Sequence, residues 1–433
     1  MGYNVRSRVG NEKFKLGDAV LSPDPEVLAT GLVPATNYTS SARYEFEIEN
    51  VFQKSWLCIG REVQASAVGD YFVFDAPFAK TSIIVVRDRD ETLHAFHNTC
   101  MHRGMKLLWD ARGHVGNFRC PYHAWTYATD GRLIGVPERA CFPQLDMANN
   151  GLREIALASW EGFVFINLDP DCKQSLDEYL GEFGTRLSGM SLGSYSHCVR
   201  LSYEVESNWK AGFDSQCEGY HVPTLHKNTV REFLSSKDNP YVRYDWVEFA
   251  GPHRSGAVPG NAEWRPSTNK PVQSFAMAQT AQMTALEDSG VKQDDVGGLA
   301  RHPGLNLNQD PLWTNEHFGI FPNLIFHPTS SGWFTAQFWP LGPGRHLWES
   351  RYYFMPPKSL REEFGIAQAI AFTRDVLMED FIAVERQQKS LESGALTHLR
   401  FSDQEMMPRH QAAVLAAIEK QVLGLAPAFS PEV

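Results

Sequence analysis

The sequence has no long apolar run, and negative charge outweighs positive charge. Its 433 residues include 40 Lys and Arg against 51 Asp and Glu, which leaves a net charge of −11. Nucleic-acid binding needs clustered Lys and Arg, so this balance argues against a nucleic-acid partner. No apolar stretch is long enough to cross a bilayer, and the first residues lack the hydrophobic region of a secretion signal. We therefore expect a cytoplasmic protein without a membrane segment.

Several familiar cysteine and cofactor signatures are also missing. Five of the seven cysteines are scattered and form no disulfide framework, which is typical of buried free thiols in a reducing compartment: Cys58, Cys141, Cys172, Cys198 and Cys217. The chain has no convincing dinucleotide fingerprint, flavin site or plant-type ferredoxin cysteine pattern. We therefore expect that it cannot accept a hydride from NAD(P)H by itself.

The two remaining cysteines each precede a histidine. Cys100 is followed by His102, and Cys120 by His123. Thiolate and neutral imidazole are ligands for soft or borderline metals. One mixed pair on each of two loops suits a [2Fe–2S] cluster in which one iron takes both Cys and the other both His. A structural zinc site is the alternative, but zinc sites usually group like ligands with like.

A second group of candidate metal ligands lies in the later part of the chain. His221 and His226 are five residues apart, and Pro223 is expected to force the chain out of a helix between them. Asp380 interrupts an apolar helical stripe and supplies a carboxylate, with Glu379 as the fallback. Two His and one carboxylate form the facial ligand set of non-haem Fe(II) oxygenases, which leaves positions open for O₂.

Each of these features also has an ordinary structural explanation. Two His at this spacing are often unrelated, and a single motif carries a high risk of a false match. An Asp on an apolar stripe commonly pairs with a neighbouring base, and Arg374 or Arg386 could serve Asp380. A metal site at His221, His226 and Asp380 is nevertheless favoured, because the same chain also contains the two Cys–His pairs.

Local patterns predict a β-rich first half and a mixed second half. Short β-runs, with an Asp130-Gly131 hairpin turn between two of them, are predicted at 71–74, 82–86, 92–96, 125–127, 133–136, 155–157 and 163–167. The second half is predicted to contain a strand at 201–206, a helix capped by Asn208, an irregular segment at 234–275, three β-runs within 317–355 and a helix at 370–393. A short amphipathic helix is predicted at 41–56.

Two sequence blocks resemble known families. The Cys-x-His-Arg-Gly block at Cys100 and the Cys-Pro-Tyr-His-x-Trp block at Cys120 closely resemble the Rieske family, although many relatives have Pro where Met101 stands. The stretch Asn208-Trp-Lys, followed by Glu218-x-Tyr-His-x₄-His, resembles the catalytic motif of Rieske non-haem iron oxygenases. The chain thus resembles the alpha, or terminal oxygenase, subunit of aromatic ring-hydroxylating oxygenases.

The resemblance implies an α+β fold. A Rieske-type β-sandwich domain is expected at 42–168, followed at 169–433 by a catalytic domain of antiparallel sheet covered by helices, of the helix-grip or START-like kind. Residues 1–41 are expected to pack on the catalytic domain. The cluster ligands would be Cys100, His102, Cys120 and His123, and the mononuclear iron ligands His221, His226 and Asp380.

The resemblance also implies a function and partners. The cluster would deliver electrons that come from NAD(P)H through a separate reductase, with or without a ferredoxin, and the Fe(II) would bind O₂ and substrate. The expected reaction is hydroxylation of an aromatic or other apolar ring, with N- or O-demethylation, for example of a quaternary ammonium compound, as the alternative. A homotrimer is expected, with or without a beta subunit. An electron carrier without an oxygenase site is the competing class, and the second ligand set argues against it.

Three further residues are expected to be catalytic. Glu218 stands where the family usually has Asp, and that position bridges the two metal centres across a subunit boundary in the family. Glu at this position is associated with relatives that attack quaternary ammonium substrates. Asp214, one turn earlier, is the alternative bridge, and Asn208 belongs to the same motif.

Overall fold

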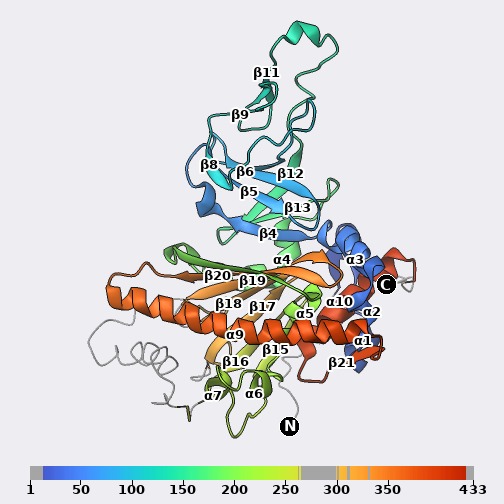
Figure 1. Cartoon of the computed structure of the whole chain (residues 1–433), viewed down its shortest axis with the longest axis vertical. Helices are drawn as coiled ribbons and strands as arrows, with labels where there is room; N and C mark the ends of the chain where they lie inside the picture. The colour runs from blue at the N-terminus through green and yellow to red at the C-terminus, as the bar shows by residue number, and fades with distance from the viewer. Residues whose placement is uncertain are drawn as a thin grey trace, which may run out of the picture. The chain divides into compact units, whose positions relative to one another are not determined.

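The computed structural model describes residues 13–261, 263–264, 299, 302–309, 313–329 and 332–425. The chain forms two compact units, Val51–Tyr179 and the combination of Met1–Asn50 with Leu180–Val433. An antiparallel sheet of seven strands stands at the centre of each unit, and long helices accompany only the second (Figure 1). The expected α+β class is therefore confirmed. Among the described residues, none of the helices combines the length and apolar character needed to cross a bilayer.

The smaller unit holds a seven-stranded sheet and a three-stranded sheet. The first has the order β4-β13-β12-β7-β6-β5-β8, and the second β11-β10-β9. β6 consists largely of β-branched residues and is fully buried from Ile83 to Val86, as expected for a central strand. The bounds are β4 Trp56–Arg61, β5 Asp70–Ala76, β6 Thr81–Arg87, β7 Leu93–His97, β8 Arg112–His114, β9 Phe118–Arg119, β10 Thr126–Tyr127, β11 Leu133–Gly135, β12 Glu154–Trp160 and β13 Phe163–Asn167.

The predicted Asp130-Gly131 hairpin joins β10 to β11, and this prediction is confirmed. The Asp130 side chain accepts a hydrogen bond from the backbone N–H of Arg132 at 3.0 Å. Gly131 has a φ of +85°, and a Cβ there would lie 2.5 Å from the ring of Phe96. Only glycine meets both demands, which ties this turn to the core of the unit.

The larger unit contains one antiparallel sheet in the order β14-β20-β19-β18-β17-β16-β15. β15 and β16 form a hairpin inside the segment predicted to be irregular, so that prediction was wrong at 246–259, where Trp246, Val247 and Phe249 are buried. The part of that segment from 265 to 275 lies outside the described residues. Four strands replace the three predicted β-runs. The bounds are β14 His197–Val205, β15 Trp246–Ala250, β16 His253–Pro259, β17 Trp313–Ile320, β18 Leu324–Pro328, β19 Trp333–Gly342 and β20 Arg345–Phe354.

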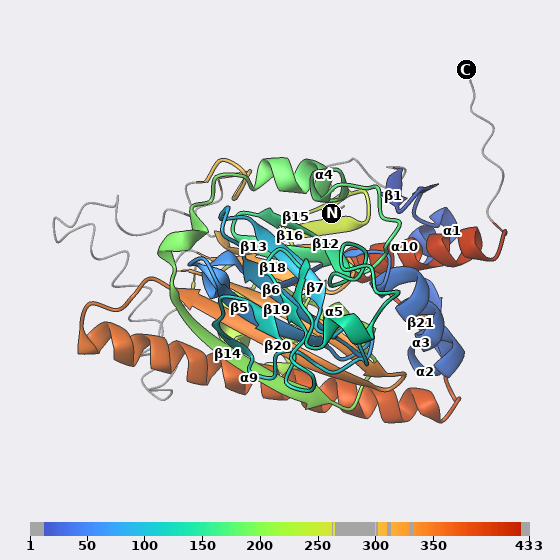
Figure 2. The same ribbon diagram turned by 90° about the horizontal axis from the view of Figure 1, so that it is seen from above.

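Two helices that contact each other also pack on this sheet, and they are central to the site. α5 (Trp209–Ser215) contacts β19 and β20, and α9 (Leu360–Glu392) contacts β14 (Figure 2). The predicted helix at 370–393 is confirmed, but it begins ten residues earlier, because Ser359 caps its first turn through a hydrogen bond from Glu362 N–H. Gly394, with a φ of +72°, follows its end.

The remaining elements tie the N-terminal residues to the larger unit. β3 (Leu32–Pro34) pairs with β21 (His398–Arg400), and α1 (Pro25–Thr30) packs against α10 (Met406–Val422). The helix predicted at 41–56 ends at Phe52, because α3 (Ser41–Glu47) continues as a π-turn and Trp56 already begins β4. The other elements are β1 Phe14–Leu16, β2 Ala19–Leu21, α2 Thr36–Thr39, α4 Leu176–Arg186, α6 Val222–Leu225 and α7 Arg231–Leu234.

Candidate metal centres

Two loops of matching construction carry the predicted cluster ligands. The carbonyl of Cys100 accepts a hydrogen bond from Gly104 N–H at 2.9 Å, and that of Cys120 from Ala124 N–H at 3.0 Å. Each Cys N–H in turn donates to the carbonyl five residues on, at 2.8 Å in both loops. Gly104 and Ala124 have φ values of +76° and +57°. For Ala this conformation costs about 1–2 kcal/mol, so the surrounding structure must enforce it.

The four side chains on these loops form a suitable donor set. Cys100 and Cys120 are buried, and the rings of His102 and His123 lie 4.7 Å apart. Burial, and to a smaller extent the neighbouring Cys120, raises the pKa of the Cys100 thiol, so the thiolate needs a cation beside it. The Nδ1 atom of His102 is buried and has no hydrogen-bond partner among the described residues. These residues therefore fit a cluster held by two Cys and two His.

Tyr127 contacts the loop that carries Cys100, and the sequence analysis assigned no role to this residue. Its hydroxyl accepts a hydrogen bond from Met101 N–H at 2.9 Å and lies 3.4 Å from Cys100 Sγ, toward which its own proton can point. A hydrogen bond to a sulfur ligand changes the reduction potential of the cluster. The available signal was an aromatic residue two positions after Trp125, the last residue of the Cys120 block.

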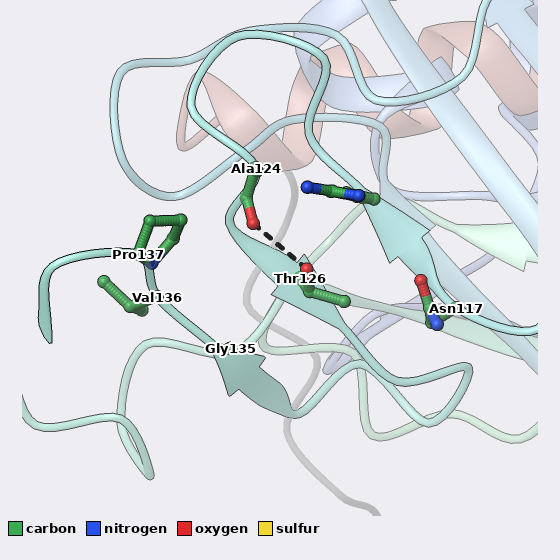
Figure 3. Close-up of a pocket in the computed structure, with 7 residues that line it drawn as sticks. Asn117, Ala124, Thr126, Gly135, Val136 and Pro137 are labelled. Atoms are coloured by element: carbon green, nitrogen blue, oxygen red, sulfur yellow. Dashed lines mark hydrogen bonds between the residues drawn. The ribbon is translucent and has the colours of Figure 1, made fainter.

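A cavity of about 440 Å³ lies beside the second loop (Figure 3). Thr126 Oγ1 donates a hydrogen bond to the Ala124 carbonyl at 3.0 Å and holds one wall of the cavity. No predicted ligand is among its lining residues, which are Asn117, Arg119, Ala124, Thr126, Gly135, Val136 and Pro137. The cavity therefore adds nothing to the ligand assignment.

In the larger unit, the three predicted iron ligands converge on one point. The Nε2 atoms of His221 and His226 are 3.1 Å apart, and Asp380 Oδ1 lies 3.6 Å and 3.3 Å from them, respectively. Asp380 is 1% exposed, and its Oδ1 has no hydrogen-bond partner among the described residues. A buried, unpaired carboxylate oxygen facing two imidazole nitrogens is a donor set that fits a divalent iron.

Two further carboxylates hold the far sides of the imidazole rings. Glu218 Oε1 contacts His221 Nδ1, and its Oε2 accepts a hydrogen bond from the His221 N–H at 3.2 Å. Glu379 Oε2 lies 2.7 Å from His226 Nδ1 and accepts a hydrogen bond from Thr229 Oγ1 at 2.6 Å. The structure thus brings Asp380, and not the fallback Glu379, to the two Nε2 atoms. Glu379 instead contacts His226 Nδ1, a position that the sequence did not predict.

The carboxylates around His221 favour a positive charge on or beside its ring. Burial alone would lower the pKa of His221, but the charge of Glu218 and its hydrogen bond to the ring, together with Asp380, raise that pKa to about 9. A proton or a metal ion can meet the same demand. Arg374, considered as a partner of Asp380 from the sequence, pairs instead with Asp375.

The chain leading to His221 is built differently from the prediction. α5 ends at Ser215, and His221 is the N-cap of the short helix α6. Pro223 therefore stands in the first turn of a helix, where the missing N–H costs nothing, and does not break one. The expectation that Pro223 interrupts a helix was wrong. Gln216, just after α5, was also missed; its side-chain amide donates to Asp380 Oδ2 at 3.1 Å.

The other two predicted catalytic residues have structural contacts. Asn208 caps α5 by accepting from Lys210 N–H at 3.0 Å, and its amide donates to the Pro343 carbonyl at 2.7 Å. The predicted cap is confirmed, whereas a catalytic role for Asn208 stays a prediction. Asp214 is buried and accepts a hydrogen bond from the Tyr38 hydroxyl at 2.6 Å. The acid in contact with His221 is thus Glu218, and the role of Asp214 as the alternative bridge stays a prediction.

Comparison with known families agrees with this geometry. The family described as "Ring hydroxylating alpha subunit (catalytic domain)" matches residues 192–420, and the "Rieske [2Fe-2S] domain" matches 55–152. The chain belongs to the ring-hydroxylating alpha subunits. It carries the two cofactor-binding domains of that family, one for a Rieske cluster and one for a mononuclear iron.

Individual relatives fall into two chemical groups. The large subunit of anthranilate 1,2-dioxygenase from Acinetobacter baylyi is 34% identical over 200 residues, which are 45% of this chain and 42% of that protein. The oxygenase subunit of carnitine monooxygenase from Escherichia coli is 34% identical over 197 residues, 45% of this chain and 52% of that protein. The matched stretches therefore span about half the length of these relatives.

Solved structures extend the likeness over nearly the whole chain. The quaternary ammonium Rieske monooxygenase CntA, in complex with an inhibitor, has a TM-score of 0.71 at 22% identity and covers 92% of this chain and 99% of that one. Naphthalene 1,2-dioxygenase from Rhodococcus sp. has a TM-score of 0.70 at 22% identity, with 92% and 96% covered. These likenesses confirm the fold, a Rieske domain joined to a helix-covered antiparallel sheet.

Proposed function

We propose that this chain is the terminal oxygenase component of a Rieske oxygenase that hydroxylates an aromatic or other apolar ring. The observation that carries the proposal is the convergence of His221, His226 and Asp380 Oδ1 in a chain that also has the two Cys–His loops. An electron carrier needs only the loops. A site with two His and one carboxylate leaves positions on the iron open for O₂, and an electron carrier does not need such a site.

Each group of residues has a defined task in this proposal. When bound, the metal centres supply single electrons and O₂ activation. Glu218 and Glu379 take the Nδ1 sides of the two His rings, so that the Nε2 atoms would face the metal when it is bound. Burial of Asp380 keeps its carboxylate away from water. The proposed ligands are Cys100, His102, Cys120 and His123 for the cluster and His221, His226 and Asp380 for the iron.

Oxidative demethylation of a quaternary ammonium compound is the second candidate. Two observations favour it: Glu218 replaces the more usual Asp, and relatives include proteins named for glycine betaine and carnitine. The relative named for anthranilate favours ring hydroxylation instead. The Glu218 side chain contacts the far side of His221, where it orients a ligand and does not by itself select a substrate.

The proposal includes partners and a cellular setting. A separate reductase, with or without a ferredoxin, passes electrons from NAD(P)H, since the sequence lacks a dinucleotide fingerprint. The chain assembles as a homotrimer in the cytoplasm, with or without a beta subunit, and serves the breakdown of aromatic compounds. The domain boundaries at residues 42 and 169 remain predictions.

A substrate panel with isotopically labelled O₂ and a reductase tests the proposal. Ring hydroxylation gives a labelled diol or phenol, whereas demethylation releases formaldehyde. An iron count separates both from a carrier: about three irons per chain are expected for an oxygenase and about two for a carrier. Two irons per chain and no oxygen incorporation would contradict the proposal.

A further inference from the structure

A row of four rings crosses the sheet of the larger unit. His327 on β18 pairs with Phe334 on β19, and Phe334 pairs with Tyr352 on β20. The rings of His317 on β17 and His327 are 4.3 Å apart, those of His327 and Phe334 4.1 Å, and those of Phe334 and Tyr352 5.1 Å. The four residues therefore lie side by side on one face of the sheet, and we call them the ring row.

The ring row lies on the face that α5 and α9 cover. Side chains two or four residues apart in a strand share a face. Phe338, four residues after Phe334, contacts Phe213 of α5 with ring centroids 5.6 Å apart. Trp348, four residues before Tyr352, contacts Phe381 of α9 at 5.0 Å. The same helix, α9, carries Asp380.

Gln216 connects the ring row to the metal site. Its side-chain amide donates to Asp380 Oδ2 at 3.1 Å, and its backbone is hydrogen-bonded to the ring of His317. His317 is also bonded through Nδ1 to the Tyr244 hydroxyl at 2.9 Å. One residue thus lies between the proposed iron ligand and the histidine end of the ring row.

His327 is the member of the ring row that lacks partners. It is fully buried, and neither of its ring nitrogens has a hydrogen-bond partner in the described part of the chain. Burial lowers the pKa of His317 to about 4 and holds that of His327 well below its ordinary value, so both rings are neutral at physiological pH. Unpaired buried polar groups are costly and rare, and each calls for a partner that completes it.

We infer that His327 binds a hydroxyl group on an aromatic substrate. A neutral imidazole offers one N–H donor and one nitrogen acceptor, and a hydroxyl group supplies the matching acceptor and donor. A quaternary ammonium group has neither an N–H nor an O–H, so that group itself could not pair with His327. The inference rests on the proposed function and deepens it, because it selects a ring that carries a hydroxyl group over a ring without one.

Binding of phenol and toluene, which differ by a hydroxyl in place of a methyl group, tests the inference. Calorimetric titration of the anaerobic holoenzyme without reductase gives both dissociation constants and avoids turnover. We expect His327→Leu to reduce the preference for phenol over toluene by tenfold or more. His327→Gln keeps a donor and an acceptor and should retain most of the preference.

The matched control is His410→Leu. His410 is also buried and stacks on an aromatic ring, that of Phe249 at 4.2 Å, but it is not part of the ring row. This variant should leave the preference unchanged. A change below tenfold in His327→Leu, or a wild-type protein that binds neither probe, overturns the inference; an unchanged preference would mean that His327 bonds only water.

Iron content, measured on the same samples, keeps this test separate from the proposed function. A wild-type chain with about two irons would contradict the oxygenase site, whatever the probes do. A chain with about three irons and no dependence on His327 would contradict only the inference. Equal iron content in wild type and His327→Leu also shows that the variant has folded around its metals.

Discussion

At the scale of single residues, the Glu218 side chain contacts both the backbone and the imidazole ring of His221. One of its oxygens contacts His221 Nδ1, and the other accepts from the N–H groups of Tyr220 and His221. A carboxylate held in this way fixes both the tautomer and the orientation of the ring. These contacts support the proposal that Glu218 positions His221.

Glu218→Gln preserves the size of the side chain and one acceptor but removes the charge. We expect both metals to stay bound and the cluster to remain reducible by the external donor, while turnover is largely lost. Single-turnover rates and iron content, measured together, check this. A single-turnover rate equal to that of wild type would show that Glu218 is not on the electron path.

Asp380 and Glu379 are adjacent, yet they should respond differently to substitution. Asp380→Ala removes one of three proposed ligands and should abolish binding of the mononuclear iron while the cluster spectrum persists. Glu379→Gln weakens only the support of His226 and should cost roughly 10–100-fold in iron affinity. Iron analysis of both variants checks the order. Full iron occupancy and turnover in Asp380→Ala would mean that another acid is the ligand.

Asp214 should make stability depend on pH. Burial raises its pKa from 3.8 to about 7, against the opposing effects of the Tyr38 hydrogen bond and the charges of Lys210 and Arg254, while Glu405 adds to the rise. Between about pH 4 and 7 the unfolded chain has released a proton that the folded protein still holds, so stability falls as pH rises through this window.

Asp214→Asn removes this dependence and keeps an acceptor for the Tyr38 hydroxyl. Relative to wild type, the variant should gain on the order of a few kcal/mol between pH 4.5 and 7.5. Urea unfolding at the two pH values measures the difference. Parallel pH profiles for the two proteins would refute the assignment.

At the scale of elements, the position of α5 depends on Asn208, the residue that caps it. Asn208 caps the helix, and its backbone N–H donates to Gln388 Oε1 of α9 at 3.0 Å. Inside the helix, Lys210 forms a buried ion pair with Glu47 of α3 at 2.7 Å. These contacts hold α5 against α3 and α9 before the chain continues to His221.

Asn208→Ala should lower the free energy of unfolding by about 1 kcal/mol, because the helix loses its cap. Asn208→Ser keeps a capping oxygen and loses the N–H donated to Pro343, so its stability should lie between those of the Ala variant and wild type. Denaturant titration of the three proteins checks this order. Equal stability of the Ala variant and wild type would mean that the cap contributes nothing.

At the scale of the whole molecule, each of the two units carries its own proposed iron centre. The cluster loops lie in Val51–Tyr179, and the His and Asp group lies in the other unit. We expect His123→Ala to remove the visible cluster spectrum while the larger unit stays folded and keeps its iron. Absorption spectra, iron analysis and circular dichroism check the result. A full Rieske spectrum in the variant would contradict the cluster assignment.

Sequence alone predicted the features that depend on residues near one another. The Cys–His loops, the Asp130-Gly131 hairpin and the Asn208 cap involve residues a few positions apart, so their geometry follows from local backbone chemistry. Local pattern failed at 246–259, because a segment rich in Gly, Pro, Asn and Ser hid a hairpin that long-range pairing stabilises. It also misjudged Pro223, because the same residue can end one helix or begin the next.

The tertiary structure alone decided which groups meet across the chain. Asp380 and Glu379 are indistinguishable by position in sequence, and the rotation of α9 against its neighbours turns one toward both Nε2 atoms and the other toward His226 Nδ1. The same holds for Gln216 beside Asp380 and for His317 beside His327. Packing of distant elements sets these contacts, and a rotation of one residue along a helix, about 100°, would exchange them.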